Sequence, residues 1–164
     1  MESYKLIKIY ADEDIEKIES ILNVKPIEIK KNIMAIKYGL SLPYFLINNF
    51  ILKENMDHVI LYSNIFLNFI RFVLENDTFS LLEIKLLEMQ KEIEELLNEY
   101  ISAEQEEVFI SLLEKYIPQK NIDIQFIKIK NTESQEIIIY NNGVITIMEN
   151  NKFESIKGML CSGI

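Results

Sequence analysis

Residues 57–75 read DHVILYSNIFLNFIRFVLE and form the most apolar part of the chain. In a helix, the few polar residues of this stretch would share one narrow stripe, because they recur at helical spacing: Asp57, Asn64, Asn68, Arg71 and Glu75. A helix that is apolar on its other sides is normally buried among other elements. We therefore expect residues 57–75 to form the central helix of the fold.

The chain before this stretch predicts one strand and three helices. Residues 4–10 read as a strand, and the acidic residues 12–14 open a helix that Asn23 ends. Pro26 suits the first turn of a second helix, which runs to about Tyr38 and ends at Gly39. A third helix is predicted from Tyr44 to about Lys53.

The chain after the central stretch begins with two helix-start patterns. Ser80 and Glu83 have the spacing of a capping box, which predicts a long helix to about Ile101. Residues 102–105 repeat this pattern and start a further helix, which we expect Pro118 to end.

The C-terminal part has the period of strands. Residues 122–130 alternate with one slip in phase, which indicates a strand with a bulge or two covered faces. Residues 137–140 and 144–148 flank Asn141-Asn142-Gly143, which favours a hairpin with a type I′ turn. Residues 153–160 predict a short closing helix.

These elements predict a single α+β domain over residues 1–164. A mostly helical body of five to six helices, about residues 12–117, would be followed by an antiparallel β-meander and a closing helix, about residues 122–161. We expect the N-terminal strand to join the meander, because an unpaired strand is costly.

Charge and composition narrow the functional classes. The net charge of −9 is concentrated in residues 75–115, which hold 12 Asp and Glu against 3 Lys. This excess disfavours non-specific binding to nucleic acid or to anionic membranes. The apolar window 59–74 is shorter than the roughly 20 residues of a membrane span, so we expect no membrane insertion.

Residue usage suggests where the protein works. The single cysteine, Cys161, cannot form an internal disulfide, and the N-terminus lacks a secretory signal, so we expect a cytoplasmic protein. By count there are 30 Ile and 15 Asn but 3 Ala, which is typical of AT-rich codon usage. A low-GC bacterium or its phage is the expected source.

No pattern in the chain indicates catalysis, a cofactor or a metal. His58 is the only histidine and has no neighbouring ligand pattern, and the four glycines are isolated, so none forms a phosphate-binding loop. The pairs Glu94-Glu95 and Glu106-Glu107 are expected on solvated helix faces, where a carboxylate is a poor acid–base catalyst. We therefore expect a non-enzymatic protein, and no residue pattern supports a known family.

The leading hypothesis is a binding or regulatory protein of the inhibitor, immunity or adaptor type. It would use an acidic helical surface to bind a protein partner. The sequence is equally compatible with a homodimer. The same charge could also serve only solubility. The candidate surface residues are Glu83, Glu94, Glu95, Glu99, Glu106 and Glu107.

A DNA-binding regulator is the first alternative. Residues 35–45, AIKYGLSLPYF, resemble the spacing of a helix-turn-helix, with a small residue, a glycine turn and then a serine. Two core helices joined by a glycine turn would give the same pattern. The candidate DNA contacts lie within residues 30–53: Lys30, Lys31, Lys37, Asn48 and Asn49.

A sensor for an apolar small molecule is the second alternative. Asn64, Asn68 and Arg71 could line a pocket beside the central helix and hold the polar end of such a ligand. They could equally face solvent or bond to loop carbonyls, and Arg71 could pair with Glu75 one helical turn away.

Overall fold

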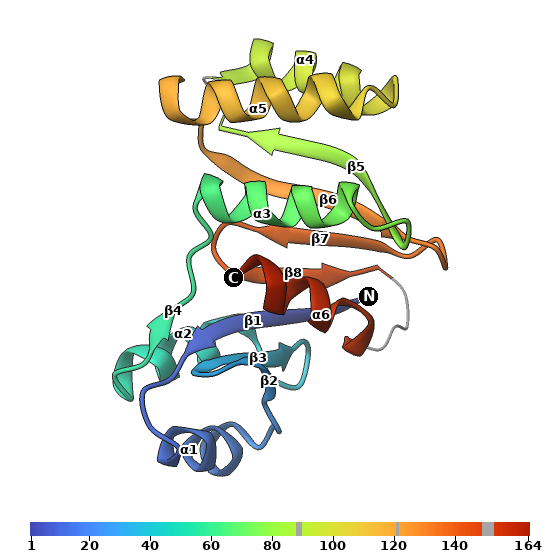
Figure 1. The fold of residues 1–164 in the computed structure, drawn as a ribbon. Helices are drawn as coiled ribbons and strands as arrows, with labels where there is room; N and C mark the ends of the chain where they lie inside the picture. The colour runs from blue at the N-terminus through green and yellow to red at the C-terminus, as the bar shows by residue number, and fades with distance from the viewer. Residues whose placement is uncertain (88–89, 121, 149–152) are drawn as a thin grey trace.

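A twisted antiparallel sheet runs through the whole molecule in the strand order β2–β3–β1–β8–β7–β6–β5 (Figure 1). The computed structural model describes residues 1–87, 90–120, 122–148 and 153–164, and only the backbone of Lys120. The strands are β1 (Glu2–Lys8), β2 (Ile27–Lys30), β3 (Ile33–Tyr38), β4 (Asp57–His58), β5 (Phe79–Leu86), β6 (Ile124–Asn131), β7 (Glu136–Tyr140) and β8 (Val144–Ile147). The short β4 lies off this path and pairs with β1.

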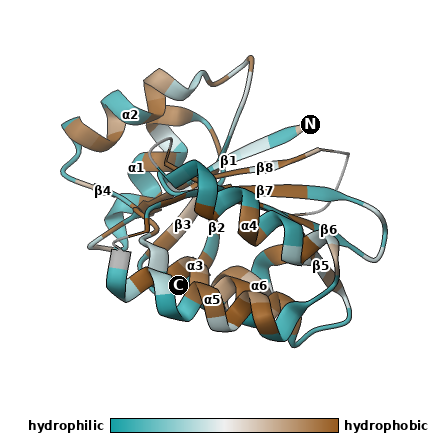
Figure 2. Ribbon diagram, turned by 90° about the horizontal axis from the view of Figure 1, so that it is seen from above, coloured by the Kyte–Doolittle hydropathy of each residue, from teal (hydrophilic) through white to brown (hydrophobic). Residues whose placement is uncertain are grey.

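Helices cover the sheet on both faces and along one edge (Figures 1 and 2). Helices α3 and α6 lie side by side on one face, α1 and α2 lie on the other face near β1 and β3, and α4 packs along β5. No helix in the described ranges is long and apolar enough to cross a bilayer. The helices are α1 (Glu13–Leu22), α2 (Tyr44–Lys53), α3 (Ser63–Leu74), α4 (Lys91–Ser102), α5 (Glu106–Lys120) and α6 (Glu154–Gly163).

Two hydrophobic cores lie on opposite faces of the sheet. The larger one joins the sheet to α3, α4, α5 and α6 and includes Phe66 and Phe69. The smaller one joins β1 and β3 to α1 and α2 and includes Ile47. In β1, Leu6 enters the larger core and Ile7 the smaller one, so both faces of this strand are covered. This double burial explains why the sequence of β1 does not alternate cleanly.

The expected order of a helical body followed by a β-meander is wrong. Strands and helices are interleaved along the chain, with six helices and an eight-stranded antiparallel sheet in the described part. The chain is still α+β, but the N-terminal strand β1 lies inside the sheet, between β3 and β8, because the β2–β3 hairpin adds to the edge that β8 leaves free.

The helix expected over residues 26–38 is wrong, because β2 and β3 form a hairpin there. Isoleucines at 29, 33 and 36 fit a helical stripe, but Asn32 adopts a left-handed conformation with φ 69° and turns the chain. Strand β3 then pairs with β1 along its whole length. Long-range pairing therefore decides the structure of a stretch whose local period is ambiguous.

The long helix expected from Ser80 is also wrong. The chain forms β5 first, and helix α4 begins only at Lys91. A β-bulge between Leu81 and Glu83 shifts the alternation, so that the buried residues Leu81 and Ile84 are three positions apart. This spacing imitates a helical period, and Ser80 and Glu83 lie in a strand and cap no helix.

The central helix is shorter than expected. Helix α3 covers Ser63–Leu74, whereas Asp57–His58 form β4 and residues 59–62 are extended. Val59 and Leu61 are buried in the larger core from this extended segment. The apolar run thus joins a short strand to a helix, and its continuous hydrophobicity hides the boundary.

The remaining helices and strands agree with the sequence, with two differences in detail. Helix α5 continues past Pro118 to Lys120. In the β7–β8 turn, Gly143 donates to the carbonyl of Tyr140 at 3.0 Å, and among the turn residues only Gly143 has a positive φ. The turn is therefore a type I turn followed by a left-handed glycine, rather than type I′.

Candidate protein-binding cleft

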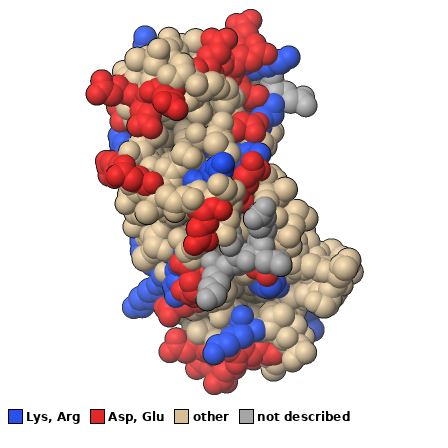
Figure 3. Space-filling model, turned by 90° about the vertical axis from the view of Figure 1, so that its right-hand side faces the viewer, with Lys and Arg blue, Asp and Glu red and all other residues tan. Residues whose placement is uncertain are grey.

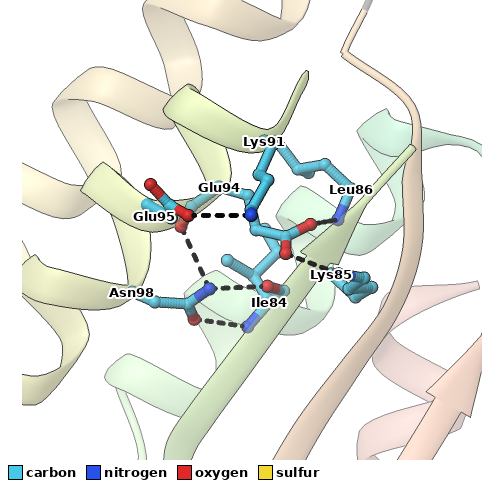
Figure 4. A network of polar contacts seen from close by, with 7 residues as sticks. All are labelled: Ile84, Lys85, Leu86, Lys91, Glu94, Glu95 and Asn98. Carbon is cyan, nitrogen blue, oxygen red and sulfur yellow. Dashed lines mark hydrogen bonds and ion pairs between the residues drawn. The ribbon is translucent and has the colours of Figure 1, made fainter. Parts of the chain in front are cut away.

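Helix α4 caps the outer edge of β5 with its side chains (Figure 4). The amide of Asn98 donates to the carbonyl of Ile84 at 2.9 Å and accepts from the N–H of the same residue at 3.0 Å. The carboxylate of Glu94 accepts from the N–H of Leu86 and from Nζ of Lys85, each at 2.7 Å. These side chains replace a neighbouring strand, because β5 is the last strand of the sheet.

A cleft of about 540 Å³ lies beside the uncapped beginning of β5. Strand β5 forms one wall, the end of α4 and the start of α5 form the other, and buried side chains of Leu81 and Phe109 contribute an apolar floor. Carboxylates of the α4–α5 turn stand at its rim. The lining residues are Leu74, Ser80, Leu81, Leu82, Ile101, Ser102, Glu104, Glu106 and Phe109.

The turn at the rim holds Glu104 in an unusual backbone conformation. Its φ is 55°, in the left-handed region that glycine usually occupies at the end of a helix. The N–H of Glu104 donates to the carbonyl of Ile101, and the N–H of Gln105 donates to that of Tyr100. This pair of bonds is a Schellman motif, so the chain places a glutamate where glycine would be more stable.

A smaller cleft of about 220 Å³ continues the first one toward α3. The two clefts share Leu74 and Glu106, and the smaller one is also lined by Arg71, Glu75, Glu107 and Ile110. In Figure 3, Asp and Glu side chains surround an uncharged area over the end of the molecule that carries α4 and α5. The combined groove therefore has apolar side chains on its floor and carboxylates around its edge.

The six predicted acidic residues do not form one surface. Glu95 and Glu99 are exposed on the outer side of α4, and Glu106 and Glu107 are exposed at the start of α5, so four of them surround the α4–α5 turn. Glu94 instead binds the edge of β5. Glu83 lies within β5, directly opposite Lys128 of β6.

The polar stripe of the central helix faces solvent. Asn64 and Asn68 are exposed, and neither lines the clefts described above. Arg71 is also exposed, and its guanidinium pairs with Glu114 of α5 at 2.5 Å, in place of the expected Glu75. The three residues therefore do not meet around a pocket.

The five residues considered for DNA contact lie on different elements. Lys30 and Lys31 are at the tip of the β2–β3 hairpin, and Lys37 on β3 pairs with Glu2 at 2.5 Å. Asn49 is exposed on α2, whereas Oδ1 of its neighbour Asn48 is buried. The first helix of a helix-turn-helix is absent, because residues 27–38 form strands.

Helix α2 buries Ile47, Phe50 and Ile51 in the smaller core. It also exposes Phe45, Leu46 and Leu52, and together with Leu40 in the preceding loop we call these residues the apolar ridge. An apolar surface of this kind is typical of a contact site. The ridge carries no charged group and lines none of the clefts described above, so nothing in its chemistry selects an occupant.

Lys5 is a buried basic residue of β1, and the half-buried His58 of β4 lies near it. Nζ of Lys5 donates to the carbonyl of Asn142, and burial lowers the pKa of Lys5 to about 8. Burial and the nearby Lys5 also lower the pKa of His58. Lys5 is only 1% exposed, so a substrate cannot reach its amine. Among the described residues no cluster of His, Cys, Asp and Glu could hold a metal ion.

Sequence reasoning missed the residues that make the cleft. Ser80, Leu82 and Phe109 were placed in helices or left out, because β5 was read as a helix. Glu104 did carry a signal, since it stands between two predicted helices, where a glycine or asparagine is usual.

Comparison of the chain with protein-family models, with curated proteins and with solved structures finds no significant match.

Proposed function

We propose that this chain is a non-catalytic protein-binding protein of the inhibitor, immunity or adaptor type. It takes a segment of a protein partner into the cleft between β5 and the α4–α5 turn. The observation that supports this most is the combination of an apolar floor with a rim of Glu104 and Glu106. Such a groove suits a segment with a large apolar side chain flanked by Lys or Arg.

The conformation of Glu104 supports a role for its side chain. A glutamate in the left-handed region lowers the stability of the fold by about 1 kcal/mol relative to glycine. The side chain of Glu104 does not offset this loss through the Schellman motif, because the bonds of that motif join backbone groups only. Residues that break a local rule of stability are frequently functional. We therefore assign Glu104 to contact with a basic group of the partner.

The uneven charge of the chain supports the same partner. The net charge of −9 belongs to the segment that builds β5, α4 and the start of α5. A local negative field accelerates encounter with a basic surface and orients it toward the cleft. Binding should accordingly weaken as the salt concentration rises.

The test selects ligands from a library of random peptides displayed on phage and measures the affinity of the selected peptides by calorimetry. The binding variant is Glu104→Gly with Glu106→Gln. The control variant, Glu19→Gln with Glu133→Gln, removes the same charge from exposed positions outside the cleft.

We expect selected peptides to combine Lys or Arg with a large apolar residue. The binding variant should lose at least tenfold in affinity, about 1.4 kcal/mol, while its fold stays at least as stable as the wild type. The control variant should keep its affinity. Selected peptides that bind the binding variant and the wild type equally would refute the proposal.

A further inference from the structure

The capping of β5 stops halfway along the strand. Glu94 and Asn98 are four residues apart on α4, so they share one face and reach Leu86 and Ile84 in turn. The next residue of this series is Ser102, which lines the cleft together with β5. Its hydroxyl, however, donates to the carbonyl of Asn98 at 2.9 Å and so turns back onto its own helix.

The outer edge of β5 before Ile84 is therefore open to the cleft. In the described part of the chain, no side chain of α4 bonds to the backbone of residues 80–82, and these three residues form the strand wall of the cleft. An edge strand presents N–H and C=O groups outward at alternate positions. The cleft thus combines unpaired strand backbone with an apolar floor.

From this geometry we infer that the partner segment binds as an added antiparallel or parallel β-strand along the first half of β5. The inference rests on the proposed function and specifies how the partner is held. In an added strand, successive side chains point to opposite sides. One side would meet the floor formed by Leu81 and Phe109, and the backbone would bond to β5.

The same edge is protected against pairing with a second copy of this chain. Pairing of two copies at this edge would bring the Glu104 and Glu106 carboxylates of both copies together, and these like charges repel. The carboxylates of Glu104 and Glu106 attract a strand that carries Lys or Arg. The occupant is therefore a basic, extended segment of another protein.

The test uses the peptides selected for the cleft and methylates one backbone amide at a time. N-methylation removes a donor without changing charge. In an added strand only every second N–H faces β5, so methylation should weaken binding at least tenfold at alternate positions and little at those between. Loss of affinity with a period of two supports the inference.

A variant of the protein tests the same contact from the other side. Ser102→Asn places an amide one helical turn beyond Asn98, where it can bond to the open edge and compete with the peptide. We expect it to weaken binding at least tenfold. Ser162→Asn is the matched control, because Ser162 is exposed on α6 outside the cleft and its hydroxyl likewise bonds to a helix carbonyl, so this variant should leave the affinity unchanged.

The two proposals fail in different ways. If binding depends on Glu104 and Glu106 but not on methylation or on Ser102→Asn, strand addition is wrong and the acidic cleft still binds its partner. If N-methylation weakens binding at every second position but the Glu104→Gly, Glu106→Gln variant binds as tightly as the wild type, strand addition is correct and the charge-based function is wrong.

Discussion

Lys5 is the residue whose burial is hardest to reconcile with its charge. It lies in the middle of β1, and its amine donates to the carbonyl of Asn142. Burial removes water from the ammonium and lowers its pKa from 10.5 to about 8. At neutral pH the folded protein therefore buries the charged ammonium of Lys5, which water solvates better in the unfolded chain.

We predict that stability rises with pH between pH 8 and 10. Below pH 8 both states bind the proton, and the folded state carries the full cost of the buried charge. Between pH 8 and 10 the folded state releases the proton first, which adds about 2 kcal/mol to the free energy of unfolding. Above pH 10 the ionisation of tyrosines in the unfolded chain opposes this gain, because burial raises the pKa of Tyr4.

Urea unfolding followed by circular dichroism at pH 7, 8, 9 and 10 measures this dependence. Lys5→Met should remove the rise, and Lys25→Met, at an exposed position, should keep it. A wild-type stability that stays flat or falls from pH 8 to 10 would contradict the assignment.

At the scale of elements, the β5–α4 pair replaces a missing strand with side chains. Asn98 satisfies both backbone groups of Ile84, whereas Glu94 satisfies one group of Leu86 and also pairs with Lys85. The amide at position 98 matters more than the charge at position 94, because an unpaired buried donor and acceptor are costly together.

We predict that Asn98→Ala lowers the free energy of unfolding by about 2–3 kcal/mol, since it leaves the N–H and C=O of Ile84 without a partner. Glu94→Gln keeps an acceptor for Leu86 and should cost about 1 kcal/mol or less. Ser102→Ala is the control, because its hydroxyl bonds only to a helix carbonyl. Equal effects of all three substitutions in chemical denaturation would disprove the capping role.

Local patterns predicted those elements whose period is unambiguous. Helices α1, α2 and α6 and strands β6, β7 and β8 lie within or near the expected ranges, because the helical period, the turns and the strand alternation agree there. Residues 26–38 and 80–86 failed, because a turn at Asn32 and a bulge at Leu81–Glu83 decide their structure, and both depend on partners distant in sequence. The cleft could not be predicted, since it requires β5 to be a strand.

At the scale of the molecule, the two cores differ in size and share β1. The larger core involves all seven strands from β2 to β5 in the sheet order and the four helices α3 to α6, and the smaller one involves β1, β3, α1 and α2. A unit with less buried apolar surface opens more readily than the rest of the fold. The helices α1 and α2 should therefore open while β6 and β7 stay paired.

We predict that native-state hydrogen exchange is at least tenfold faster for amides of α2 than for amides of β6 and β7. Ile47→Ala, in the smaller core, should accelerate exchange in α1 and α2 and leave β6 and β7 near the wild-type rate. Phe69→Ala, in the larger core, should accelerate both sets. A uniform response to Ile47→Ala would mean that the protein opens only as one unit.

The place of β1 between β3 and β8 has a consequence for synthesis of the protein. Tyr4 faces Ile145 across the β1–β8 pair, so the chain must have left the ribosome at least to Ile145 before this pair can close. Until then, β1 can pair with β3 and, at Ile7 and Lys8, with β4, but the first half of its other edge stays unpaired. The nascent chain therefore exposes a hydrophobic strand during synthesis. The yield of folded protein in the cell should then depend on the speed of translation and on chaperones.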